Sequence, residues 1–96
     1  MSENLKIVAQ ATIEAFGIRL FTNGDHRAYQ MMEISFGNAG ITERTFSVAP
    51  VDFAAIINGI LYSKTISEFL EAVENTWIAE RIDGMISEIW RQMEDY

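Results

Sequence analysis

The first apolar segment of the chain, residues 5–16, fits two different periods. Apolar residues occupy every second position, which is the period of a β-strand. Lys6, Gln10 and Glu14 also form a polar stripe spaced by four residues, as on one side of an α-helix. Three alanines favour the helix, and the segment is long for a strand. Gly17 would then lie just past the helix end, where a left-handed cap is common. We predict an N-terminal helix here, with a long strand as the alternative.

The middle of the chain has the pattern of three strands joined by short turns. Residues 18–22, about 28–36 and 41–48 are rich in β-branched and aromatic residues, as strands are. Asn23-Gly24 separates the first two and favours a tight hairpin turn. Gly37-Asn38-Ala39-Gly40 separates the second from the third. Two short connections in succession predict a three-stranded antiparallel meander.

The second half of the chain is predicted to be helical. Pro50 ends the strand region and opens a helix, because proline suits the first helical turn. Another helix begins at Thr65, since Thr65-Ile66-Ser67-Glu68 matches a capping box. The chain therefore predicts a single α+β domain, residues 1–96. In it an N-terminal helix or long strand precedes the meander, and two or three C-terminal helices pack on the sheet.

The apolar stripe of the C-terminal helical region changes direction near Trp77. On a helical wheel, the stripes before and after this residue face directions that differ by roughly 160°. Either the chain breaks near Asn75-Thr76 and a third helix folds back, or one helix of about 28 residues and about 42 Å projects from the domain. We place Trp77 in the core. In the projecting arrangement, the apolar interface with a partner or a second copy consists of Ile78, Ile82, Met85, Ile89, Trp90 and Met93.

The net charge of −7 is concentrated in the second half of the chain, where residues 50–96 hold nine acidic and three basic residues. Such a surface repels the phosphates of nucleic acid and attracts basic proteins. The plain interpretation is that this acidity keeps a small protein soluble. The functional interpretation is an acidic face that binds a basic partner, formed by Glu68, Glu71, Glu74, Glu80, Asp83 and Glu88.

Candidate catalytic and metal-binding chemistry is sparse. His26 is the single histidine, beside the predicted hairpin turn, and no nucleophile motif accompanies it. Gly37 and Gly40 lack the lysine and the following helix of a phosphate loop. We expect no catalytic, cofactor or metal site. The lack of cysteine, of a signal-peptide pattern and of a long apolar run favours a cytoplasmic protein that does not bind membranes.

The predicted order of elements is similar in layout to some acidic chaperones of bacterial secretion and to some small phage-encoded inhibitors of host nucleases, with no shared motif. We expect a non-enzymatic protein-interaction module, a homodimer, that contacts a basic protein and not nucleic acid itself. Its most concrete form is an inhibitor that imitates the charge of nucleic acid. One alternative is an acidic dimeric chaperone or assembly factor that binds through apolar helix surfaces, and a less favoured one is a small-molecule enzyme.

Overall fold

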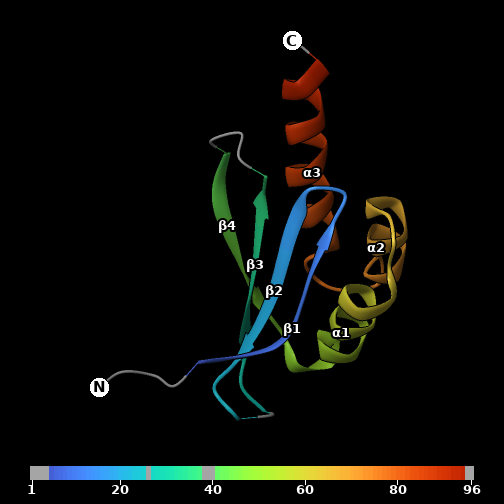
Figure 1. Ribbon diagram of the computed structural model, residues 1–96. Helices are drawn as coiled ribbons and strands as arrows, with labels where there is room; N and C mark the ends of the chain where they lie inside the picture. Colours follow the sequence, from blue (N-terminus) through green and yellow to red (C-terminus); the bar gives the residue numbers. More distant parts are fainter. Residues whose placement is uncertain (1–4, 26, 38–40, 95–96) are drawn as a thin grey trace.

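The computed structural model describes residues 5–25, 27–37 and 41–94, with the backbone alone for residues 41–43, 93 and 94. Four antiparallel strands form one sheet in chain order: β1 (Lys6–Ile13), β2 (Phe16–Thr22), β3 (Gln30–Phe36) and β4 (Ile41–Val48). A 3-10 turn, η1 (Pro50–Asp52), leads into α1 (Phe53–Tyr62), α2 (Ile66–Ala72) and α3 (Ala79–Glu94). The helices cover one face of the sheet and leave the other face open (Figure 1). The α+β class is thus confirmed, with four strands in place of three.

The predicted N-terminal helix is wrong, because residues 6–13 form β1 and turn back into β2. Glu14 and Ala15 make the turn with φ values of 49° and 74°, both in the left-handed region. Neither residue is the glycine, asparagine or aspartate that usually marks such a turn, so the pattern gave no sign of it. Gly17 lies in β2, not at a helix end. A Cβ at this position would lie 2.9 Å from Oγ of Ser35 on the neighbouring strand.

Asn23 and Gly24 begin a longer loop between β2 and β3, not the predicted tight turn. The buried side chain of Gln30, the first residue of β3, holds this loop in place. Its Nε2 donates to the carbonyl oxygen of Asp25 at 2.7 Å, and its Oε1 accepts from the backbone N–H of Asn23 at 2.9 Å. These bonds satisfy backbone groups that the ladder of a tight hairpin would otherwise pair. His26 lies outside the described residues.

The helical region breaks at residues 73–78, as one of the two predicted arrangements requires. Besides backbone hydrogen bonds, two bonds that involve side chains hold the turn. Oγ1 of Thr76 donates to the carbonyl oxygen of Val73 at 2.7 Å, and the backbone N–H of Trp77 donates to Oδ2 of Asp52 at 3.0 Å. Asp52 is buried in η1, so a residue distant in sequence anchors the turn between α2 and α3. Neither glycine nor proline is needed.

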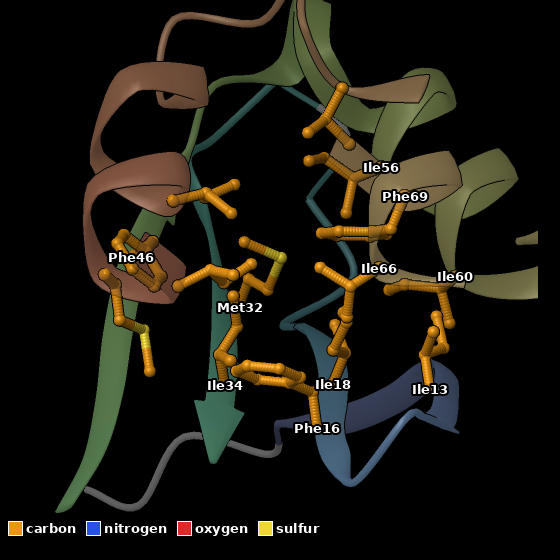
Figure 2. Packing of buried hydrophobic residues seen from close by; sticks show 14 of the residues in the cluster. Ile13, Phe16, Ile18, Met32, Ile34, Phe46, Ile56, Ile60, Ile66 and Phe69 are labelled. Carbon is orange, nitrogen blue, oxygen red and sulfur yellow. The ribbon is translucent and has the colours of Figure 1, made fainter. Parts of the chain in front are cut away.

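The break turns both apolar stripes of the helical region toward the sheet. Figure 2 shows side chains of the sheet, among them Ile18 and Met32, meeting Ile56, Ile66 and Phe69 of the helices in one cluster. These side chains are fully buried, and the removal of each from water contributes roughly 1.5–3 kcal/mol to folding. From α3 the same core receives Ile82, Ile86 and Ile89.

Four of the six residues predicted to form an apolar interface pack in the core of the chain. Ile78, Ile82, Met85 and Ile89 are all buried within the chain itself, and the side chain of Met93 lies outside the described set. Trp90 keeps 41% of its surface exposed. The core position predicted for Trp77 is also wrong, since this side chain is 70% exposed. Trp77 lies in the turn, where the helical wheel that placed it no longer applies.

Candidate protein-binding site

Four of the six predicted acidic residues come together between α2 and α3. Glu71 lies in the last turn of α2, Glu74 in the turn that follows, and Glu80 and Asp83 in the first turns of α3. With Leu70 and Ala79 they line one open hollow of about 390 Å³, which we call the acidic hollow. All four carboxylate side chains are exposed.

The break at residues 73–78 produces this convergence. Glu80 and Asp83 are three positions apart on α3, so their Cβ atoms are about 5–6 Å apart and face the same side. The turn brings that side of α3 toward the end of α2, where Glu71 and Glu74 are likewise three positions apart. In an unbroken helix the two pairs would follow one another along a single rod.

The electrostatics of the acidic hollow are one-sided. No lysine or arginine is among the described residues that line it, and none of its four acids forms an ion pair within the described part of the chain. Neighbouring like charges on a helix cost about 0.2–0.5 kcal/mol per pair. Glu71 is also in the last turn of α2, where the helix dipole disfavours a carboxylate. The helix dipole favours Glu80, which lies in the first turn of α3, but helix stability does not account for Glu71.

Glu68, the fifth predicted residue, has a structural role. Its Oε1 accepts from the backbone N–H groups of Lys64 at 2.7 Å and Thr65 at 3.3 Å, while Oγ1 of Thr65 accepts from the N–H of Glu68. This is the capping box predicted from the sequence, and it is confirmed. The carboxylate of Glu68 thus closes the start of α2, and Glu68 is not among the residues that line the acidic hollow.

Glu88, the sixth, lies in a different environment from the acidic hollow. It lines a hollow of about 320 Å³ on the other flank of α3, together with Arg44 of β4 and Arg81. The predicted acidic face therefore divides into three parts: a group of four acids, a helix cap and a mixed-charge hollow. The pattern of exposed acids predicted the residues but not this division, because Arg44 reaches α3 only through the tertiary fold.

Two further carboxylates position the helices that form the acidic hollow. Oε1 of Glu14, in the β1–β2 turn, accepts from the backbone N–H of Ile66 at 2.7 Å and so fixes the first residue of α2. Asp52 fixes the turn before α3 through its bond to Trp77. The sequence pattern placed Glu14 on the polar side of a helix and did not indicate that either residue anchors the helices. Asp52 immediately follows Pro50-Val51 at a helix start, and that position was the one available signal.

Within residues 5–25, 27–37 and 41–94, no three or more histidine, aspartate or glutamate side chains are grouped as metal ligands would be. None of the helices described is long and apolar enough to cross a membrane. Comparison of the chain with protein-family models, with curated proteins and with solved structures finds no match in any of the three.

Proposed function

We propose that this chain is a protein-binding module that holds basic side chains of a partner protein in the acidic hollow. The observation that carries the proposal is the convergence of Glu71, Glu74, Glu80 and Asp83 on one open surface whose described lining has no basic residue. The chain maintains this repulsive arrangement, and bound lysine or arginine side chains would relieve it.

The lining of the acidic hollow suits such side chains. Leu70 and Ala79 are half-buried and offer an apolar floor between the carboxylates. Lysine and arginine bury their aliphatic stems on apolar surface while their charged ends reach polar partners. Charge-assisted hydrogen bonds from guanidinium to carboxylate are among the strongest that proteins make. Because the same basic side chains bind phosphates, the concrete form of the proposal is an inhibitor that competes with nucleic acid for its partner.

The alternative function, a chaperone or assembly factor acting through the apolar face of α3, has less support. Ile78, Ile82, Met85 and Ile89, which it requires at the surface, are buried in the core of the chain. Replacing one of them, as in Ile82→Asp, would test folding and not partner binding.

The test is a quantitative pull-down from source-cell lysate with three forms of the protein, washed at low and at high salt. The first is the wild type, and the second carries glutamine at positions 71, 74, 80 and 83. The third is a control with equal net charge, in which four exposed residues outside the acidic hollow become lysine: Gln10, Thr12, Ser47 and Tyr62.

We expect the wild type and the lysine control to retain a basic nucleic-acid-binding protein at low salt, and the glutamine variant to lose it. The glutamine variant should be slightly more stable than the wild type, because like-charge repulsion is removed, so unfolding would not explain the loss. Added nucleic acid should displace the captured protein. Equal retention by all three forms, or loss in the lysine control as well, would show that the acidic hollow is not the binding site.

A further inference from the structure

The hollow on the other flank of α3 carries both signs of charge. Arg44 reaches it from β4, and Arg81 and Glu88 reach it from α3. All three side chains are exposed, and none forms an ion pair within 4 Å with another described residue. Two of the seven basic residues of an acidic chain therefore meet here beside one carboxylate, without neutralising one another by direct contact.

Gly84 lies between Arg81 and Glu88 on α3 and lines the same hollow. Glycine inside a helix is destabilising relative to alanine. A Cβ at Gly84 would meet no atom of the chain within 4 Å, and its φ is not in the left-handed region. Neither packing nor backbone conformation within the chain explains the glycine. What it provides is a stretch of bare helix backbone that another element can approach closely.

The three residues have the spacing of a self-complementary surface. Arg81 is three positions before Gly84, and Glu88 is four positions after it, so all three lie along one stripe of α3. If a second α3 crosses antiparallel with Gly84 near the two-fold axis, Glu88 of the partner subunit lies opposite Arg81, and the reverse pair forms equally. Such reciprocity is the defining property of an isologous interface.

We propose that a second copy of this chain packs antiparallel along the Arg81–Gly84–Glu88 stripe, and that the partner's Glu88 enters the hollow between Arg44 and Arg81. This interface replaces the apolar one predicted from the sequence. The hollow that takes part in this pairing is lined by Arg44, Arg81 and Glu88, and it shares no lining residue with the acidic hollow. The inference therefore does not depend on the proposed function.

The association is weak, because a single helix crossing buries less than the roughly 1,200 Å² typical of stable complexes. It is measured by sedimentation equilibrium at low salt, with protein up to about 1 mM, a concentration that corresponds to about 4 kcal/mol of association free energy. We compare the wild type with Arg81→Glu, with Glu88→Arg, with an equimolar mixture of the two variants, and with the double variant that carries both substitutions.

Each single variant is expected to lower the association constant by about tenfold or more, because both reciprocal pairs become repulsive. The mixture and the double variant restore association, since each again joins an arginine to a glutamate across the two-fold axis. General repulsion between acidic chains makes the opposite prediction for Glu88→Arg, which lowers the negative charge and would strengthen association. This variant therefore separates specific pairing from net charge.

Lys64→Glu serves as the matched control for Arg81→Glu, since it changes the net charge equally at an exposed position on the α1–α2 connection, and it should leave the association constant nearly unchanged. Gly84→Leu should abolish association while circular dichroism shows a folded chain. The inference is overturned if the wild type is monomeric at every protein concentration up to about 1 mM. It is equally overturned if the mixture fails to associate, or if dimers persist in both charge-reversed variants.

Discussion

The same substitution at two helix glycines is expected to change stability in opposite directions. Gly59 lies in α1 where the helix packs against α2. A Cβ there would lie 3.0 Å and 3.1 Å from two ring carbons of Phe69, and 3.4 Å from Cβ of Ala72. Phe69 is completely buried, so its ring has little room to yield. At Gly84 nothing lies within 4 Å of the same added atom.

The magnitudes follow from two opposing effects. Alanine is favoured over glycine inside a helix by about 1 kcal/mol. Overpacking of a tight core costs about 1–3 kcal/mol. Gly84→Ala gains helix propensity without overpacking and should stabilise the chain by about 0.5–1 kcal/mol. Gly59→Ala gains the same helix propensity but also overpacks the core, and it should destabilise the chain by about 1 kcal/mol. For a domain of this size, 1 kcal/mol shifts the melting temperature by about 4–8 °C.

The assay is thermal and urea unfolding followed by circular dichroism, at low protein concentration so that association makes no contribution. In a Phe69→Leu background, Gly59→Ala should lower the free energy of unfolding by less than it does in the wild type. The smaller leucine side chain leaves space for the added methyl group. If Gly59→Ala is as stabilising as Gly84→Ala, the close packing of α1 on α2 is wrong. A destabilised Gly84→Ala would show that this position is not open helix surface.

Three further variants test the β1–β2 turn and the two carboxylates that hold the helices. Ala15→Gly should raise the free energy of unfolding by about 1 kcal/mol, because glycine adopts the left-handed conformation without strain, and unchanged or lower urea stability would refute the turn. Glu14→Ala should cost about 1–2 kcal/mol through loss of the bond to the Ile66 N–H, whereas Glu14→Gln, which keeps an acceptor, should cost less in the same assay. Asp52→Ala should cost about 1–3 kcal/mol and speed amide hydrogen exchange at Trp77, and exchange as slow as in the wild type would exclude the proposed anchor.

Much of the fold was predictable because local signals agreed with the tertiary structure. The β4 strand and the capping box at Thr65 followed from residue patterns, and the break before α3 was one of the two arrangements that the patterns allowed. The prediction for residues 5–16 was wrong because their apolar residues fit the period of a strand and that of a helix equally well. In addition, the turn at Glu14-Ala15 has no residue typical of turns. Its strain is offset by tertiary contacts, among them the bond from Glu14 to α2.

The candidate site was predictable only in part. Amphipathic spacing identified the exposed acids correctly, because an amphipathic helix in a small domain turns its charged side to solvent. Which acids meet depends on the direction of the turn at residues 73–78, and the buried carboxylate of Asp52 anchors that turn from outside the helical region. The mixed hollow likewise required the placement of Arg44 beside α3. Such contacts between distant parts of the chain leave no local pattern.

Binding of a basic partner between α2 and α3 can be observed residue by residue with NMR. ¹⁵N-labelled protein is titrated with a short arginine-rich peptide at low and at high salt, and amide shift changes are mapped on the structure. We expect them to concentrate around Glu71, Glu74, Glu80 and Asp83, to disappear at high salt, and to be absent from the glutamine variant. Shift changes on the open face of the sheet, or shift changes that are undiminished in the glutamine variant, would show that the peptide does not bind in the acidic hollow.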